Sequence, residues 1–442
     1  MTRNNCGPVR ETPIGAIATD WEIGVISDFV ASLQAGVSVN AVEVEPGCDD
    51  NAVGVLKTSA VLQGRFFPKQ YKAVVPKDAE RVATCVAGDR VIISRMNTPA
   101  LVGESGYVVQ SHPNLFLPDR LWQTVPSERP HSQRWLSYWL QHPSIRRLIS
   151  AAATGTSNSM KNISKDSVLS LPVPRTPLPE QQKIAAILTT VDDKLDVIAR
   201  QIEATQTLKR GLMQTLFRRG VGAQDTDGRW VPHTEFKGSE LGQIPVGWEV
   251  KPLGGMSQES RTRNAGSLDD ALLCGVLKDQ GLVPMRERVK GATTERCRIV
   301  ESNAFAYNPM RINIGSIARN FRDHAVMVSP DYVVFATKAE ELMPSYLDHF
   351  RRSDEWQRFV GRSGDGGVRI RIYYDDLAQL RMRVPPLKEQ ARIVEVLDCV
   401  SEKLNNLTTK QREFQNLKHG LMHKLLTGEW RVKLEGAEPL AA

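Results

Sequence analysis

The sequence predicts an α/β (α+β) protein in which two globules are separated by two long antiparallel coiled-coil helices, as a pseudo-two-fold internal repeat. One observation is that a stretch of about 39 residues occurs twice, 209 residues apart. Another is that each copy carries apolar residues at alternating steps of three and four, which is typical of a coiled coil. A third is that the segment before each copy has short β-rich runs between glycine and proline turns.

The repeated stretch is ungapped, and 15 of 39 positions are identical between residues 178–216 and 387–425. Glu180 matches Glu389, for example. A second match opens each half, where residues 14–22 resemble residues 241–249 at a shift of 227. We infer that the two globules have diverged while the helices between them have not.

Each repeated stretch is expected to form one helix of roughly 38 residues, about 57 Å long at 1.5 Å per residue. Prolines precede both starts, and Gly220 and Gly428 follow the last apolar positions, where glycine commonly ends a helix. The residues expected in the coiled coil and the subunit interface are Leu188, Val191, Leu195, Leu208 and Leu212 in the first copy, and Leu397, Val400, Leu404, Leu417 and Leu421 in the second.

These signals divide the chain into six parts. If the two apolar seams pair, the second helix runs antiparallel to the first and brings the C-terminus back near the N-terminus. The alternative is that each helix packs only on its own globule. The expected parts are an N-terminal globule (1–176), a conserved helix (177–219), a linker (220–243), a C-terminal globule (244–384), a second conserved helix (385–428) and a tail (429–442).

Composition points to a cytoplasmic protein with a mild preference for a polyanion. The net charge is +7 and the isoelectric point about 9.0. The six cysteines are scattered singly, as in a reducing compartment. We see neither a signal peptide nor an apolar stretch long enough to cross a bilayer, so no membrane partner is expected.

The motifs of catalysis are missing, so we expect no enzyme activity and no catalytic residues. The sequence has no phosphate-binding GxxxxGK[ST] loop and no GxGxxG. Asn308, Pro309 and Met310 begin like the Asn/Asp-Pro-Pro-aromatic motif of amino-methyltransferases, but the second proline and the aromatic residue are absent. No histidine or cysteine cluster suggests a metal, and no cofactor is expected in this chain.

The helix starts LPEQQKIAAILTTVDDKL and LKEQARIVEVLDCVSEKL, the ends KRGLMQTL and KHGLMHKL, and the duplicated layout resemble the specificity subunits of type I restriction–modification systems. Residues 36–40 and 56–61 look like that family's first target-recognition domain, and residues 306–311 like its second. The resemblance implies that each globule recognises one half of a split double-stranded DNA site in the major groove. It also implies that the helices set the gap and bind methyltransferase subunits, two of them, while restriction (motor) subunits join the complex.

S-adenosylmethionine, ATP and magnesium would then be held by those partner subunits. Within residues 245–377 there are 15 arginines against 4 lysines, several in close pairs, and the arginine fork matches guanine edges and phosphates. For any single arginine the alternative is a solvated salt bridge. The candidate DNA-binding residues are Ser38, Asn40, Lys57, Arg95, Asn97, Asn158 and Lys161 in the first globule, and Arg261, Arg263, Lys278, Arg311, Asn313, Arg362 and Arg369 in the second.

Two other functions remain open at this point. One is a coiled-coil scaffold with two protein-binding globules, which affinity for duplex DNA would distinguish. The other is an enzyme that fuses recognition to catalysis, which the missing motifs disfavour. The recognised bases and the length of the gap do not follow from the sequence.

Overall fold

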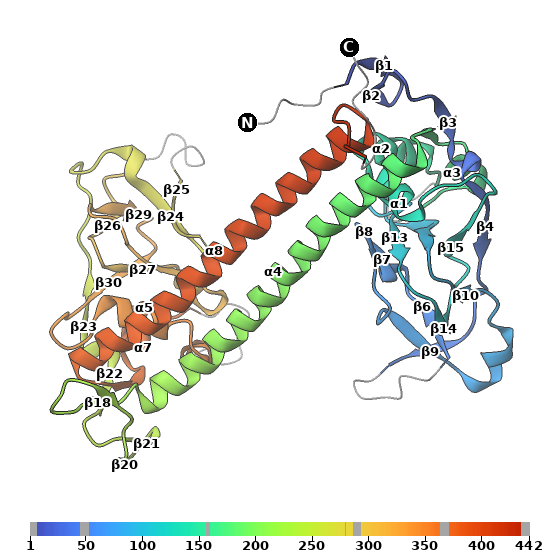
Figure 1. Ribbon diagram of the computed structural model, residues 1–442. Helices are drawn as coiled ribbons and strands as arrows, with labels where there is room; N and C mark the ends of the chain where they lie inside the picture. Colours follow the sequence, from blue (N-terminus) through green and yellow to red (C-terminus); the bar gives the residue numbers. More distant parts are fainter. Residues whose placement is uncertain are drawn as a thin grey trace. The chain divides into compact units, whose positions relative to one another are not determined.

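The computed structural model describes residues 7–44, 53–155, 160–278, 280–285, 293–362 and 371–434. The chain forms two compact units (Figure 1). Unit 1 comprises Met1–Ile198 and Lys410–Ala442, and unit 2 comprises Ala199–Thr409. Two long helices, α4 (Leu178–Arg219) and α8 (Leu387–Leu426), contribute one part to each unit. The predicted mixture of two sheet-rich globules and two long helices is therefore confirmed.

Unit 1 contains a six-stranded sheet in the order β4-β15-β11-β13-β8-β7 and a five-stranded sheet in the order β10-β14-β6-β9-β5. Its helices are α1 (Gln133–Gln141), α2 (Pro143–Ala152) and α3 (Lys165–Leu169). Its strands are β1 (Val9–Thr12), β2 (Gly15–Ala18), β3 (Ile23–Val25), β4 (Val30–Ala35), β5 (Ala41–Glu43), β6 (Gly54–Leu56), β7 (Val61–Leu62), β8 (Gly64–Phe66), β9 (Tyr71–Val74), β10 (Cys85–Val86), β11 (Arg90–Ser94), β12 (Met96–Asn97), β13 (Ser105–Val108), β14 (His112–Phe116), β15 (Leu121–Pro126), β16 (Lys161–Asn162) and β17 (Pro172–Pro174).

Unit 2 contains two four-stranded sheets, in the orders β23-β30-β27-β28 and β25-β24-β29-β26. Its short helices are α5 (Pro344–Phe350), α6 (Asp354–Arg362) and α7 (Tyr374–Ala378). Its strands are β18 (Ala223–Gln224), β19 (Trp230–Val231), β20 (Phe236–Ser239), β21 (Gly242–Pro245), β22 (Glu249–Pro252), β23 (Ser257–Ser260), β24 (Leu273–Leu277), β25 (Gly281–Pro284), β26 (Arg298–Val300), β27 (Phe305–Tyr307), β28 (Ile317–Arg319), β29 (Val326–Val328), β30 (Val333–Thr337) and β31 (Arg381–Val384).

The two units repeat one framework around the helix ends. Each has a hairpin, β1–β2 or β20–β21, and a pair of short helices, α1–α2 or α5–α6. Each also pairs the strand after its hairpin with the strand before a long helix, as β3 with β17 and β22 with β31. The sheets between these shared parts differ in strand number and order, which agrees with globules that have diverged.

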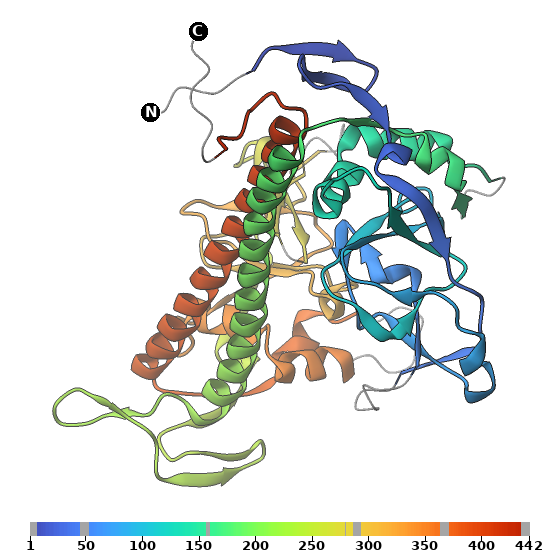
Figure 2. The same ribbon diagram turned by 45° about the vertical axis from the view of Figure 1, so that its right-hand side comes forward.

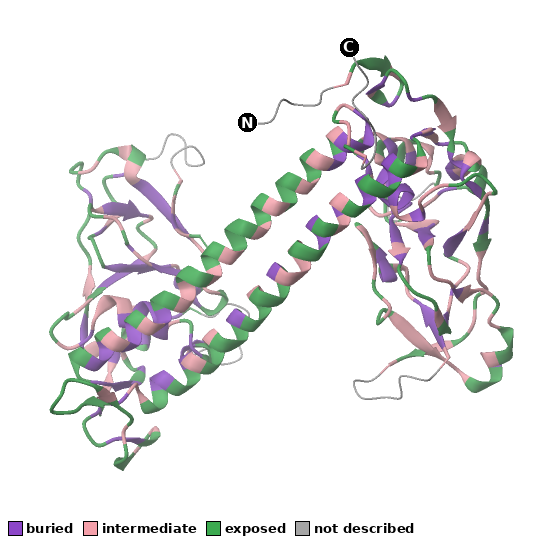
Figure 3. Ribbon diagram, in the orientation of Figure 1, coloured by how far each residue is buried: buried purple, intermediate pink, exposed green. Residues whose placement is uncertain are grey.

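In each unit the main apolar core joins the start of one long helix to the end of the other. In unit 1 it includes Ile184 and Leu188 of α4 with Leu426 of α8, and the burial colours of Figure 3 show buried residues among exposed ones at these helix ends. In unit 2 it includes Phe217 of α4 and Leu397 of α8. Since the start of each helix meets the end of the other, the helices run antiparallel, and their halves lie side by side in Figures 1 and 2.

Along each long helix, positions that alternate in steps of four and three residues form one buried side, which repeats every seven residues. Every residue at these positions is buried or half-buried, including Thr205, Lys209 and Lys418. Leu208 and Leu417, which the sequence placed in the coiled coil, are out of phase by one residue and are 53% and 48% exposed. The in-phase positions are Ile184, Leu188, Val191, Leu195, Ile198, Ile202, Thr205, Lys209, Leu212 and Leu216 in α4, and Ile393, Leu397, Val400, Leu404, Leu407, Gln411, Phe414, Lys418, Leu421 and Leu425 in α8.

The contacts of Glu180 and Glu389 explain why both copies of the repeat have a glutamate at this position. Glu389, at the start of α8, accepts hydrogen bonds from the backbone N–H groups of Val221 and Gly222, which follow α4, at 3.0 and 3.1 Å. Glu180, at the start of α4, pairs with Arg431, which follows α8, at 2.6 Å. Each glutamate thus ties the start of one long helix to the chain leaving the other.

The glycines that end the long helices are required by their backbone and by their surroundings. Gly220 and Gly428 both have a φ of +71°, a conformation that L side chains rarely adopt. A Cβ atom at Gly220 would lie 1.9 Å from Glu389 Oε1, and one at Gly428 would lie 2.7 Å from the Cβ of Ala18. The prediction that these glycines end the helices is confirmed.

Candidate nucleic-acid interface

A groove in unit 2 gathers arginines from three pairs that are close in sequence. Arg261 and Arg263 follow β23, Arg296 and Arg298 lie at the start of β26, and Arg371 precedes α7. We call this groove, together with the Tyr373 and Tyr374 side of α7, the arginine groove. Antiparallel pairing of β23 with β30 and an isolated bridge between Arg263 and Arg298 bring these segments together.

Glu259 organises two of these arginines. Its carboxylate accepts from Arg261 Nε at 2.7 Å and from Arg298 at 3.0 Å. Arg298 is also held by the carbonyl oxygen of Pro330 at 3.3 Å, whereas Arg261 and Arg263 are exposed. The hydroxyl groups of Tyr374 and Ser257 share a hydrogen bond at 3.0 Å. Burial raises the pKa of the Tyr374 hydroxyl, so this group stays neutral. The groove therefore offers fixed guanidinium forks, which suit guanine edges and phosphate oxygens.

The other candidates of unit 2 lie outside the arginine groove. Lys278 lines a separate hollow with Arg319, Arg322 and the exposed ring of Phe321. Arg311 and Asn313 are exposed on the turn between β27 and β28. Arg362, the last residue of α6, lines a third groove beside the end of α4. Arg369 lies outside the described residues.

In unit 1 the pairing of β12 with β16 brings three candidates together. Asn97 faces Lys161 across this pair, and Arg95 precedes β12. The Arg95 guanidinium lies 5.8 Å from the centre of the Trp122 ring and donates to Asn162 Oδ1 at 3.4 Å. Sequence reasoning missed Trp122 and also Lys165, whose ammonium lies 6.0 Å from the same ring. No local pattern could have indicated them, because Trp122 and Lys165 lie 27 and 70 positions along the chain from Arg95.

The remaining candidates of unit 1 are partly engaged with acidic neighbours. Asn40 donates through Nδ2 to Asp78 at 2.8 Å, and Lys57 forms an ion pair with Glu43. Hydrogen bonds from Lys57 and Lys72 hold the pKa of Glu43 below its usual value. Ser38 is exposed. Asn158 lies outside the described part of the chain.

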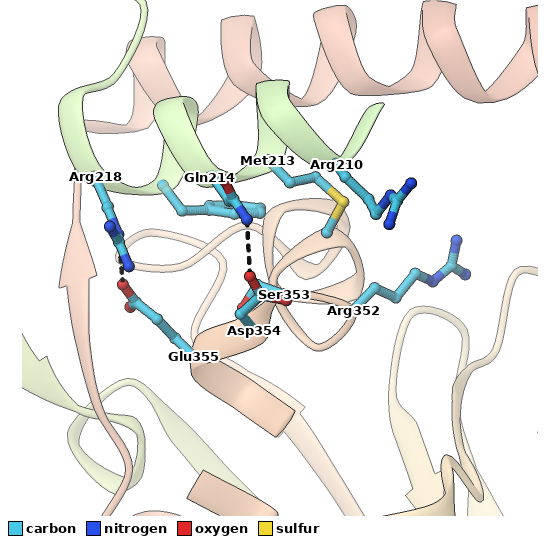
Figure 4. A pocket seen from close by; sticks show the side chains of 9 residues that line it. Arg210, Met213, Gln214, Arg218, Arg352, Ser353, Asp354 and Glu355 are labelled. Carbon is cyan, nitrogen blue, oxygen red and sulfur yellow. Dashed lines mark hydrogen bonds and ion pairs between the residues drawn. The ribbon is translucent and has the colours of Figure 1, made fainter. Parts of the chain in front are cut away.

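A smaller hollow between the last turns of α4 and the start of α6 is shown in Figure 4. Gln214 donates to Asp354 at 3.0 Å, and Arg218 lies 3.6 Å from Glu355, while Arg210 and Arg352 extend toward the open side. These contacts fix α6 against α4. Because they fill the space between the two helices, we regard the hollow as packing and not as a ligand site.

The described residues hold no cluster of three His, Cys, Asp or Glu side chains that could bind a metal ion. None of the helices in the described ranges has the length and apolar character needed to cross a membrane.

Known proteins that are similar to this chain share one description. Residues 68–206 match the model described as the type I restriction modification DNA specificity domain. The putative type I restriction enzyme MjaX specificity subunit of Methanocaldococcus jannaschii is 23% identical over 445 residues, covering 96% of this chain and 97% of that one. The EcoKI specificity subunit of Escherichia coli K12 is 21% identical over 455 residues, covering 95% and 92%.

The fold agrees with these relatives. The crystal structure of the type I restriction–modification S subunit from M. genitalium has a TM-score of 0.57 at 14% identity, covering 94% of this chain and 97% of the other. Over nearly its whole length the chain is similar to type I restriction–modification specificity subunits. The resemblance to specificity subunits that the sequence indicated is therefore confirmed. The alternative of a coiled-coil scaffold finds no support.

Proposed function

We propose that this specificity subunit recognises a DNA site made of two short unlike motifs around a gap of fixed length, with one motif bound by each globule. The chain itself would catalyse no reaction. Methyl transfer, ATP hydrolysis and cleavage would be the work of partner subunits, which would hold S-adenosylmethionine, ATP and magnesium.

One observation carries this proposal. The two units share the parts that hold the long helices but present different basic groups on their globules. Unit 2 offers a groove of arginine pairs, whereas unit 1 offers Arg95, Lys161 and Lys165 around Trp122. Different donors on a common framework suit two unlike half-sites, since the hydrogen-bond pattern of the major groove distinguishes each base pair.

The exposed leucines of the long helices support two copies of a partner. Leu208 and Leu417 occupy the same position of the repeat, and each leaves about half of its surface exposed. A face present twice in one chain fits a partner that binds twice, as two methyltransferase subunits would. Restriction subunits would join through that complex.

A labelled methyl-transfer assay tests the division of labour. The purified chain should bind duplex DNA but transfer no methyl group from labelled S-adenosylmethionine, because it lacks the motifs for that chemistry. Addition of its methyltransferase subunits should produce transfer. Methyl transfer by the chain alone, or no affinity for duplex DNA, would contradict the proposal.

A further inference from the structure

A third groove of unit 2 is rich in arginine and is separate from the arginine groove. It lies where α4 ends, between the β20–β21 hairpin, α6 and β31, and we call it the α4-end groove. Six arginines line it against two glutamates, Glu240 and Glu355. The arginines are Arg218, Arg219, Arg358, Arg362, Arg381 and Arg383.

Half of these arginines are held by the two glutamates. Arg218 and Arg383 contact Glu355, and Arg381 contacts Glu240. The other three, Arg219, Arg358 and Arg362, are exposed, and no carboxylate of the described residues lies within ion-pair distance of them. Arg358 donates through Nε to the backbone oxygen of Asp354 at 3.2 Å, which leaves its terminal nitrogens free of a carboxylate. The groove therefore keeps three guanidinium groups that no carboxylate of the described residues neutralises.

The internal repeat provides a comparison within the same chain. When the glycines that follow the two long helices, Gly220 and Gly428, are aligned, Arg218 and Arg219 correspond to Leu426 and Thr427. At the shift of 209 residues, Arg381 and Arg383 correspond to Pro172 and Pro174. The buried residues Ile145 and Ile149 of α2 correspond to Trp356 and Val360 of α6, so Arg147 matches Arg358 and Ala151 matches Arg362.

Unit 1 therefore folds on the same framework with only one of the six arginines. It follows that the framework does not require this charge, and that the arginines are an addition to the second half. A function common to both halves, such as docking of two identical subunits, would not explain a feature present in only one.

The α4-end groove adjoins the arginine groove through α7. Tyr373, Tyr374 and Asp375 line the arginine groove, and Gln379, Leu380 and Arg381 line the α4-end groove. The five residues of α7 span about 7.5 Å at 1.5 Å per residue, which is roughly two base-pair steps of a duplex. A polyanion bound in one groove can therefore continue into the other.

We propose that the α4-end groove binds phosphates of duplex DNA next to the bases that unit 2 recognises, which rests on the proposed function. Arginine forks match phosphate oxygens, and contacts to the backbone fix the position of a protein without selecting bases. The groove would thus strengthen binding at the second half-site and leave its sequence preference unchanged.

The salt dependence of DNA binding tests this proposal on the full-length chain. The probe is a duplex that carries the recognised site with ten extra base pairs on each side. In the double variant Arg358→Gln/Arg362→Gln, the slope of log affinity against log salt should become shallower by about 2, since each lost phosphate contact removes about 0.9. Arg358→Lys/Arg362→Lys should keep the slope, because the charge is retained. Arg147→Gln, the exposed counterpart on α2, is the matched control and should also keep it.

Each outcome supports or overturns the inference. A shallower slope together with unchanged preference for the recognised bases supports it. An unchanged slope in the glutamine double variant, with wild-type binding still specific, overturns this inference alone. If that variant instead loses a partner subunit at an unchanged slope, the groove binds an acidic protein and the inference is wrong. A wild-type chain that binds no duplex would overturn the proposed function as well.

Discussion

At the scale of single residues, His142 is an ionisable group that the fold keeps neutral. It lies between α1 and α2, is 2% exposed, and stacks on Trp139 at 5.2 Å and on His423 at 5.7 Å. Burial first, and then the nearby His423 and His419, lower the pKa of its ring to about 4. The neutral ring is useful there, because Nδ1 accepts from the backbone N–H of Ser144 at 3.4 Å and caps α2.

Stability should therefore fall as the pH falls through the range between these pKa values. The unfolded chain binds a proton at His142 near pH 6.5, whereas the folded chain binds it only near pH 4, so acid favours unfolding. This one group should cost about 2 kcal/mol of unfolding free energy between pH 8 and pH 5. His142→Asn, which can cap the helix but does not titrate, should show a correspondingly smaller decline in urea unfolding. Equal declines in the two proteins would contradict the assignment.

At the scale of the long helices, the row of apolar residues on the buried side is interrupted by a lysine at the same position of each copy. Lys418 pairs with Asp192 at 2.6 Å, and Asp192 also accepts from the hydroxyl of Tyr138 at 2.7 Å. Lys209 is its counterpart, and burial lowers its pKa while Asp398 and Asp348 oppose that shift. A polar residue at such a position costs stability but can fix the register of paired helices.

Removing the carboxylate of Asp192 should destabilise unit 1. Asp192→Asn would leave Lys418 and Arg134 without the charge they face, and breaking such a buried pair costs about 3–5 kcal/mol. Asp193→Asn is the matched control, because Asp193 is exposed on the next position of α4 and should change stability by less than about 0.5 kcal/mol. Thermal or urea unfolding compares the two. Similar losses in both variants would show that the pair does not hold the helices in register.

The helices are also predicted to set the gap of the DNA site. Inserting seven residues after Ile198 in α4 and seven after Thr409 in α8 places one heptad in each helix at the boundary of the two units. Each insertion adds about 10 Å and preserves the apolar phase, so the preferred gap should lengthen by roughly three base pairs at 3.4 Å per pair. The methylated sites of cells that carry the variant with its partner subunits give the gap directly. A folded variant that methylates sites with the original gap would rule the helices out as the spacer.

At the scale of the whole molecule, the features that sequence predicts are those with a local or repeated pattern. The long helices and their glycine ends follow from periodicity and from the identity of the two copies. The phase of the seam near Leu208 and Leu417 did not, because the polar residues Lys209 and Lys418 occupy the buried positions and the nearest leucines lie beside them.

The candidate interface was predicted less completely for a related reason. Close arginine pairs in the sequence indicated Arg261 and Arg263, but their meeting with Arg298 and Arg371 depends on strand pairing between distant segments. Trp122 and Lys165 gave no signal beside Arg95 for the same reason. Which of these side chains contacts a base stays a prediction.

The most direct test replaces residues 245–377 with the corresponding segment of another specificity subunit. The variant is placed in cells together with its methyltransferase subunits, and the methylated DNA sites of those cells are then sequenced. Because each globule is proposed to recognise one motif, the replacement should change one half of the site and keep the other half and the gap. A change in both halves, or in neither, would contradict recognition by two independent globules.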